Sequence, residues 1–260
     1  MILQYLVEDL TNVKVQGNTN VEISKIEYDS KKIEPNDVFV AINGFEENGN
    51  DYIQEALEKK AKCIVLEKDS YDLGKIPEEV TVIEVENTRI ALAKMATTYY
   101  GNPALSLKLI GVTGTKGKTT TAYMIRDILN ASGKKTGMIG TIYNTYADKQ
   151  IESTRTSPES LDLQRLLKEM VDAGMEYVVM EVSSHALELH RVYGLKFIIS
   201  VFTNLSEEHL DFHKTMENYL AAKAKLFEMS DFAMINGDDI YAPKLMKMIH
   251  CKVATYGLDN

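Results

Sequence analysis

The sequence has few cysteines and no long apolar run. Its 260 residues include two cysteines, Cys63 and Cys251, which exclude a disulfide framework and a zinc cluster. No apolar stretch approaches the roughly 18 residues that a membrane-spanning helix needs. The first ten residues lack a basic region and carry Glu8 and Asp9, so we expect no signal peptide. These absences predict a cytoplasmic protein without a membrane partner.

Positive charge is also in deficit. The chain has 29 Lys and Arg against 38 Asp and Glu, which gives a formal net charge of -9. General nucleic-acid binders carry a basic surface, so we expect no nucleic-acid partner. Local cations can still attract an anionic substrate on an acidic protein. Repeats and low-complexity segments are absent, and the length is typical of two domains.

Residues 1–102 are expected to form a small α/β domain. Runs rich in β-branched residues predict strands at 38–42, 63–66 and 80–83. Apolar spacing predicts a helix over 51–60, and Asn87 or Thr88 could cap a second helix that ends near Tyr100. The sequence Gly-Asn-Pro at 101–103 stops that helix, and we place the domain boundary there.

Residues 103–260 are expected to form a second domain in which strands and helices alternate. The expected strands are 107–112, 136–140, 177–182 and 197–202, and the expected helices are 119–131 and 161–173. The last two strands are near-continuous apolar runs, as expected of strands buried on both faces. This alternation predicts an α/β fold with a mostly parallel sheet covered by helices.

A glycine-rich segment, GVTGTKGKTTT at 111–121, follows a predicted strand and opens a predicted helix. Such glycines let backbone N–H groups and the helix N-terminus face a phosphate. Lys118 is then expected to reach the β- and γ-phosphates of a nucleotide, and the Thr119 hydroxyl to bind Mg²⁺. The strict P-loop pattern has glycine where this chain has Val112. The nucleotide-binding residues predicted here are Gly114, Thr115, Lys116, Gly117, Lys118, Thr119 and Thr120.

A P-loop alone is compatible with a small GTPase switch. The sequence lacks the Asn-Lys-x-Asp guanine motif and the Asp-x-x-Gly switch motif of those proteins. We therefore disfavour a binding switch.

Two polar clusters follow predicted buried strands. The first, EVSSHAL at 181–187, begins with Glu181, and the second, TNLSEEHLDFH at 203–213, contains His209. Ligands of open α/β sheets bind at the carboxyl ends of the strands, and a carboxylate there can hold Mg²⁺. Glu181 and His209 could thus converge on one metal region, while His185 could equally serve only to orient its loop.

These motifs, together with YLAAKAKLF at 219–227, occur in this order in the Mur ligases, which the sequence resembles over nearly its whole length. The P-loop of that family departs from the strict pattern in the same way. Residues 28–41 resemble the uridine-nucleotide domain of the two later-acting members. The sequence TSPE at 156–159, with EVSSHAL, resembles the member that adds the third amino acid to the muramoyl dipeptide.

The resemblance implies roles that spacing does not. The lysine at position 223 is carbamylated in the family, which turns a cation into an oxygen ligand for Mg²⁺. Lys225 lies about 200° around a helix from Lys223, so only one of them can face the metal. Ser30 and the loop 44–49 are expected to contact the uridine diphosphate sugar. The dipeptide is expected at Thr156, Ser157, Ser183 and Arg191, and ATP additionally at Asn204, Asn236 and Asp238.

The implied activity is ATP-dependent amide formation. The dipeptide carboxylate would attack the γ-phosphate of ATP, and an amino acid would displace phosphate from the resulting acyl phosphate. The implied catalytic residues are Lys118, Glu181, His209 and Lys223. The implied magnesium ligands are Thr119, Glu181, His209 and Lys223.

Several questions stay open in the sequence. The family has a third, C-terminal domain that binds the amino acid, so we expect this chain to be a partial and inactive form. The added residue could be meso-diaminopimelate or L-lysine. Alternatives are a sister ligase, such as the muramoyl-tripeptide, polyglutamate or cyanophycin type, or a non-catalytic nucleotide-binding fragment. We expect a monomer.

Overall fold

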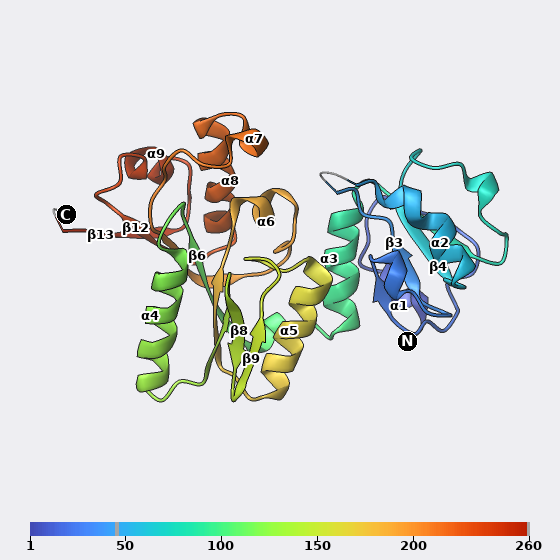
Figure 1. Ribbon diagram of the computed structural model, residues 1–260, viewed down its shortest axis with the longest axis horizontal. Coiled ribbons are helices and arrows are strands. Elements are labelled where there is room, and N and C mark those ends of the chain that lie inside the picture. The colour runs from blue at the N-terminus through green and yellow to red at the C-terminus, as the bar shows by residue number, and fades with distance from the viewer. Residues whose placement is uncertain (45–46, 259–260) are drawn as a thin grey trace. The chain divides into compact units, whose positions relative to one another are not determined.

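The computed structural model describes residues 1–44 and 47–258. The chain divides into two compact units, Met1–Asn102 and Pro103–Asn260 (Figure 1). The division falls at the Gly-Asn-Pro sequence that ends a helix. Each unit has its own sheet and its own hydrophobic core.

The first unit has a five-stranded sheet in the order β1-β5-β4-β3-β2. Strand β1 pairs antiparallel with β5, and the other pairs are parallel. The strands are β1 (Lys14–Gln16), β2 (Ile26–Glu27), β3 (Val38–Val40), β4 (Cys63–Glu67) and β5 (Thr81–Val85). The helices are α1 (Leu3–Val7), α2 (Ile53–Glu58) and α3 (Thr88–Tyr99), with short 3₁₀ turns at Ser30–Lys32, Gly49–Tyr52 and Leu73–Lys75.

Local sequence explains these elements. Asn87 caps α3 by accepting hydrogen bonds from the N–H groups of Arg89 and Ile90, as its position predicts. The helix expected over 51–60 is shorter than predicted because a 3₁₀ turn, Gly49–Tyr52, forms its first part. Two residues of the predicted substrate loop 44–49, at positions 45 and 46, lie outside the described residues.

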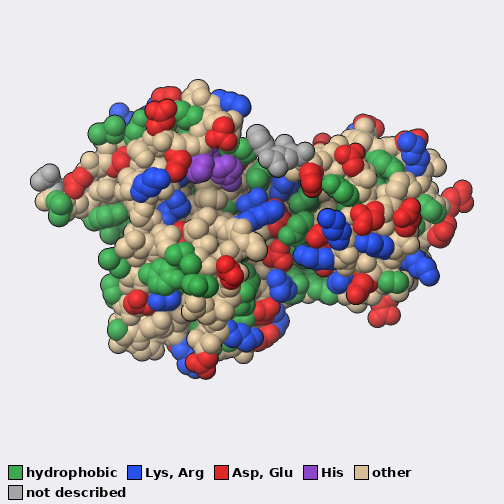
Figure 2. All heavy atoms as spheres, in the orientation of Figure 1, with side chains coloured by type: hydrophobic (Ala, Val, Ile, Leu, Met, Phe, Trp, Pro, Cys, Tyr) green, Lys and Arg blue, Asp and Glu red, His purple; other side chains and the backbone are tan. Residues whose placement is uncertain are grey.

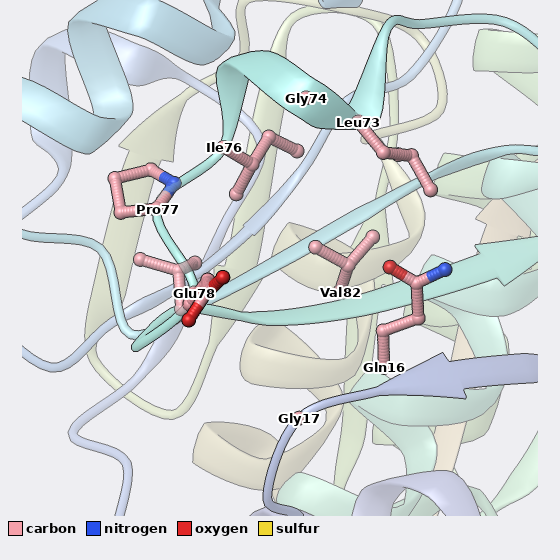
Figure 3. Close-up of a pocket in the computed structure, with 9 residues that line it drawn as sticks. Gln16, Gly17, Leu73, Gly74, Ile76, Pro77, Glu78 and Val82 are labelled. Carbon is pink, nitrogen blue, oxygen red and sulfur yellow. The ribbon is translucent and has the colours of Figure 1, made fainter.

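A hollow of about 470 Å³ lies in the first unit beside β1, β5 and the 3₁₀ turn Leu73–Lys75 (Figure 3). Apolar side chains from Leu73, Ile76 and Val82 line it, and Gln16 and Glu78 supply polar atoms. No residue that the sequence predicted as functional lines this hollow.

The second unit has an eight-stranded sheet in the order β13-β12-β11-β6-β10-β7-β8-β9. The six strands from β13 to β7 are parallel, and β8 and β9 form an antiparallel hairpin at one edge. The strands are β6 (Lys108–Thr113), β7 (Thr136–Ile139), β8 (Tyr143–Tyr146), β9 (Lys149–Glu152), β10 (Tyr177–Glu181), β11 (Phe197–Phe202), β12 (Phe232–Asn236) and β13 (Lys252–Tyr256). The α/β fold class with a mostly parallel sheet is confirmed.

Helices pack on both faces of this sheet. One face packs against α4 (Lys118–Ala131) through Ala122 and Ile125, and the other packs against α5, α8 and α9. The remaining helices are α5 (Ser160–Asp172), α6 (Ser184–Glu188), α7 (Leu210–His213), α8 (Met216–Glu228) and α9 (Ala242–Met246). Within the described residues, no helix combines the length and apolar character that crossing a membrane requires.

The connections of the central strands create a place for a ligand. Strand β6 lies between β10 and β11 in the sheet, but the chain leaves β6 through α4 to reach β7 on the far side of β10. The chain also crosses from β10 to β11 on the other side of β6. Ligands of open α/β sheets bind at such a reversal of strand order, beyond the carboxyl ends of the strands.

Candidate active site

The P-loop curls between β6 and α4. Gly114 has φ 149° and Gly117 has φ 80°, which are backbone conformations that glycine adopts without strain. A Cβ on Gly114 would overlap the Thr203 hydroxyl and lie 3.1 Å from the backbone of Asn204. The loop is therefore packed on the segment that follows β11, while its other side and the first N–H groups of α4 remain available to a ligand.

Lys118, the first residue of α4, bends back over the P-loop. Its Nζ donates to the carbonyl oxygens of Gly114 at 3.0 Å and Thr115 at 2.9 Å. Burial lowers the pKa of Lys118, and the nearby carboxylates of Glu181 and Glu208 oppose that shift. The ammonium is thus held at the mouth of the loop, close to where the helix N-terminus would receive a phosphate.

Glu181 lies at the end of β10 and is fully buried. Its carboxylate accepts hydrogen bonds from the Thr119 hydroxyl at 2.9 Å, the Thr141 hydroxyl at 3.0 Å and the Thr141 N–H at 2.9 Å. A Cβ on Gly140, the residue that follows β7, would overlap this carboxylate, so a side chain there would displace it. The structure brings the two predicted metal ligands Thr119 and Glu181 together.

These donors suit Mg²⁺. A hydroxyl and a carboxylate oxygen are hard ligands, and Mg²⁺ in phosphate-transfer sites usually takes one or two protein oxygens and completes its shell with water and phosphate. Among residues 1–44 and 47–258, no group of three or more His, Cys, Asp or Glu side chains forms a metal cage. The arrangement fits a nucleotide-bound Mg²⁺ better than a metal held by protein alone.

A buried cluster of rings surrounds Lys223. Its Nζ lies over the Tyr219 ring, 4.4 Å from the centroid, and donates to the Gly114 carbonyl at 2.8 Å. The Tyr219 ring stacks on His213, and His209 packs edge-on against His185. Burial lowers the pKa of Lys223 well below its ordinary value. Figure 2 shows histidine side chains gathered in one patch of this unit, with Lys and Arg side chains beside it.

Lys223 and Lys225 face different ways, as the helical period predicts. Lys223 is 1% exposed and contacts the P-loop, whereas the partly exposed Lys225 pairs with Glu188 at 2.8 Å. His209 has a left-handed backbone, φ 57°, and a partly exposed side chain. The predicted metal ligands His209 and Lys223 thus belong to one ring cluster, through Tyr219.

The pKa of His213 predicts that stability depends on pH. Burial lowers this pKa to about 4, and the charge of His185 adds to the effect. Because the folded chain favours the neutral ring, stability is full above pH 6.5 and falls as the pH drops towards 4. Between about pH 7 and about pH 4.5, we expect the free energy of unfolding of the unaltered chain to decrease by about 2 kcal/mol more than that of His213→Phe. Urea unfolding of both proteins at the two pH values measures this, and identical decreases would contradict it.

The residues expected to hold the dipeptide lie at the carboxyl ends of β7 and β10. The Ser157 hydroxyl contacts the Glu181 carbonyl and the Ser183 N–H, at 3.0 and 3.1 Å. Thr156 meets Thr141, with 3.2 Å between their hydroxyls. Arg191 donates through Nε to the buried carboxylate of Glu159 at 3.2 Å and through Nη1 to the Ser157 carbonyl at 3.4 Å. The structure therefore brings these four predicted residues together.

The residues expected near the adenosine follow the next strands. Asn204, just after β11, exchanges two hydrogen bonds with the backbone of Lys116. Asn236, at the end of β12, donates to the Thr203 carbonyl at 2.8 Å, and Asp238 accepts from the Leu258 N–H at 2.6 Å. Asn204 touches the P-loop directly, whereas Asn236 and Asp238 lie further along the same sheet edge.

Ser30 belongs to the first unit. It is 5% exposed, and its hydroxyl donates to Glu55 at 2.6 Å, while Lys59 donates to its carbonyl at 2.8 Å. The hydroxyl therefore already has a partner in this structure. Its expected contact with the uridine nucleotide remains a prediction.

Sequence reasoning missed three residues that hold this site together. Thr141 binds Glu181 twice, Tyr219 lies under Lys223, and Glu159 binds Arg191. Thr141 follows directly on a predicted strand, and Glu159 and Tyr219 lie within the TSPE and YLAAKAKLF motifs, but none of these signals indicated a role for the three residues. The roles of Tyr219 and Glu159 depend on contacts with residues that are distant in the sequence.

The Mur ligase middle domain model matches residues 112–260, and the model of the Mur ligase family catalytic domain matches residues 22–100. The chain belongs to the Mur ligase family. The resemblance to the Mur ligases, which the order of the motifs predicted, is therefore confirmed.

Mur ligases of one named kind resemble this chain over its whole length. The UDP-N-acetylmuramoyl-L-alanyl-D-glutamate--2,6-diaminopimelate ligase of Clostridium perfringens is 47% identical over 265 residues, and that of Clostridium botulinum is 50% identical over 260. These matches cover all of this chain but 54% and 53% of those proteins. The chain thus spans about half the length of the curated relatives it matches.

Solved Mur ligase structures share the fold. A structure of a UDP-N-acetylmuramoyl-L-alanyl-D-glutamate--2,6-diaminopimelate ligase has a TM-score of 0.82 and 26% identity, and the match covers all of this chain and 53% of that one. MurF from Acinetobacter baumannii has a TM-score of 0.66 and 19% identity, with 98% of this chain and 53% of that chain covered. The second likeness bears on the fold alone.

Proposed function

We propose that this chain forms the nucleotide- and dipeptide-binding part of an ATP-dependent ligase. The ligase would add a diamino acid to UDP-N-acetylmuramoyl-L-alanyl-D-glutamate in the synthesis of a peptidoglycan precursor. The names of relatives that are 47% to 50% identical support this substrate and support diaminopimelate as the added residue. Because ATP and the nucleotide precursor are cytoplasmic compounds, the proposal places the protein in the cytoplasm.

One observation carries the proposal. Lys118, Thr119 and Glu181 converge beside the P-loop, within a few residues of the Thr156–Ser157 segment. Phosphoryl transfer depends mainly on positioning and charge neutralisation, and this cluster supplies a cation, a metal-binding oxygen pair and a helix N-terminus. The nearby hydroxyls of Thr156 and Ser183 would position an acceptor carboxylate beside the phosphate.

The chain's own residues would divide the work. Lys118 would bind the phosphates, with the N–H groups of residues 114–120 around them. Thr119 and Glu181 would hold Mg²⁺, which neutralises phosphate charge when bound. Thr156, Ser157, Ser183 and Arg191 would orient the dipeptide, whose carboxylate attacks the γ-phosphorus as ADP leaves. Asn204, Asn236 and Asp238 would lie towards the nucleoside.

Lys223 would contribute a second oxygen ligand. Burial lowers the pKa of Lys223 and so favours the neutral, nucleophilic amine, which can attack CO₂ to give a carbamate and release one proton. The anionic carbamate, with His209, would then suit a second Mg²⁺. Unmodified Lys223 instead donates to the Gly114 carbonyl, so this role depends on the modification.

The two alternatives, a sister ligase and a non-catalytic nucleotide-binding fragment, are less well supported. Among solved structures, MurF has a TM-score of 0.66 and 19% identity, against 0.82 and 26% for the diaminopimelate ligase. A fragment that only binds nucleotide would not need the Arg191 and Ser157 arrangement beside Glu181. Diaminopimelate ligation therefore remains the proposal that accounts for both the P-loop and its neighbours.

Calorimetric titration of the chain tests the proposal. We expect binding of a non-hydrolysable ATP analogue that weakens when Mg²⁺ is removed with EDTA. We also expect UDP-N-acetylmuramoyl-L-alanyl-D-glutamate to bind more tightly than the corresponding tripeptide precursor. Absence of binding by both nucleotides would refute the proposal, and preference for the tripeptide precursor would favour the sister ligase.

A further inference from the structure

Two arginines share one buried carboxylate beside the proposed dipeptide site. Glu159 is 2% exposed, and its Oε2 lies 3.2 Å from Arg191 Nε and 3.5 Å from Arg155 Nη1. Two guanidinium groups and one carboxylate carry a net charge of +1. A cluster with surplus positive charge in a half-buried setting is suited to an anionic group.

The two arginines differ in exposure. The side chain of Arg191 is 14% exposed and also donates to the Ser157 carbonyl, so it is built into the loop. The side chain of Arg155 is 50% exposed, and its described ion pair with Glu159 is made through Nη1. The Ser153 hydroxyl donates to the Arg155 carbonyl at 2.7 Å, which fixes the backbone there. Arg155 is thus an anchored cation that a ligand can reach.

A chain of contacts leads from this cluster to the P-loop. Arg155 precedes Thr156, the Thr156 hydroxyl meets Thr141, and Thr141 binds the Glu181 carboxylate. Glu181 in turn accepts from Thr119. The segment that carries Arg155 therefore lies at the sheet edge at which a phosphate and an acceptor carboxylate would meet.

The proposed substrate supplies a matching anion. A dipeptide that ends in D-glutamate has two carboxylates, and amide formation consumes one of them. The other stays charged throughout the reaction and needs a partner. We propose that Arg155, held by Glu159 together with Arg191, binds a glutamate carboxylate of the dipeptide and so selects substrates that end in an acidic residue. This inference rests on the proposed function.

Binding of two matched ligands to the 260-residue chain tests the inference. One ligand is UDP-N-acetylmuramoyl-L-alanyl-D-glutamate, and the other is the same molecule with both glutamate carboxylates amidated. We expect Arg155→Met to weaken binding of the acidic ligand by about tenfold, the lower end for a charged hydrogen bond, and to leave binding of the amidated ligand unchanged. Arg155→Lys should retain part of the preference, because it keeps the charge without the planar fork.

Arg165→Met is the matched control. Arg165 is 53% exposed and pairs with Asp162 and Glu169 on α5, so its loss removes a similar surface arginine outside the cluster. It should not change the affinity for either ligand. Thermal unfolding of all variants tests whether they fold alike. We expect similar unfolding temperatures, because the replaced arginine side chains are about half exposed.

The outcomes separate the two hypotheses. If the unaltered chain binds neither ligand, the proposed function is refuted and the inference with it. If the chain prefers the acidic ligand and Arg155→Met retains the full preference, the inference alone is wrong. An equal loss of affinity for an ATP analogue in Arg155→Met would also overturn it, since Arg155 would then serve the nucleotide phosphates.

Discussion

Replacement of Lys118 by alanine is expected to reduce the affinity for an ATP analogue with Mg²⁺ by about 100-fold or more. Charge-assisted hydrogen bonds to phosphate each contribute about 1.5–3 kcal/mol, and the ammonium would make more than one. The fold should survive, because the Gly114 carbonyl keeps Lys223 as a donor and Lys118 lies on only the first turn of α4. Calorimetric titration measures the loss, and circular dichroism checks the fold.

Two further variants define the cause. Lys118→Met keeps the aliphatic stem and should lose as much affinity as alanine, because the ammonium is the binding group. Lys196→Ala removes a lysine that is 76% exposed and pairs with Asp231 on the surface, so it should leave nucleotide affinity unchanged. Full affinity in Lys118→Ala would rule out the P-loop as the nucleotide site.

The parts of the fold that the sequence predicted best are those with strong local signals. Strands β6, β10 and β11 begin and end within one residue of the expected positions, because each is an apolar run between polar segments. Helix α4 begins one residue early, at Lys118, since the P-loop glycine Gly117 is its N-cap. A strand that is buried on both faces and a glycine that caps a helix can each be recognised from the residues of one short segment.

The hairpin of β8 and β9 could not be predicted in the same way. Strand β9, Lys149–Glu152, is exposed throughout, and β8 alternates buried and half-buried residues over only four positions. Neither carries the apolar run that identified the central strands. Their place in the sheet comes from backbone pairing, because β8 pairs with β7 and β9 pairs with β8, and that pairing leaves no apolar pattern in the sequence.

The site shows the same division. The P-loop, Glu181 and the two lysines of α8 could be selected by motif and period, and the structure groups the first two around Thr119. The partners that hold them could not. Glu159 appeared in the sequence only as the last residue of the TSPE motif, with no role of its own, yet its carboxylate is buried against Arg191. Charge pairing across about 30 residues leaves no periodic trace in one sequence.

Replacement of Gly114 by alanine is expected to cause a large loss of stability in the second unit. Its φ of 149° lies in a region that residues with a side chain rarely adopt, and the added Cβ would overlap the Thr203 hydroxyl. Backbone strain costs about 1–3 kcal/mol and overpacking a similar amount, so we expect a decrease of about 3 kcal/mol or more in the free energy of unfolding. Denaturant unfolding followed by circular dichroism measures it.

Gly117→Ala separates strain from overlap. Gly117 also has a positive φ, 80°, but nothing lies within 4 Å of an added Cβ, so this variant should lose only about 1 kcal/mol. Thr203→Ala provides the second test, because it removes the hydroxyl that Gly114→Ala would meet. The double variant should be less destabilised than the sum of the two single variants, since part of the overlap is gone. Equal losses in Gly114→Ala and Gly117→Ala, with additive behaviour towards Thr203→Ala, would mean that the P-loop does not pack against the segment after β11 as described. The hydrogen bonds from Lys118 and Lys223 to the Gly114 carbonyl would then be wrong as well.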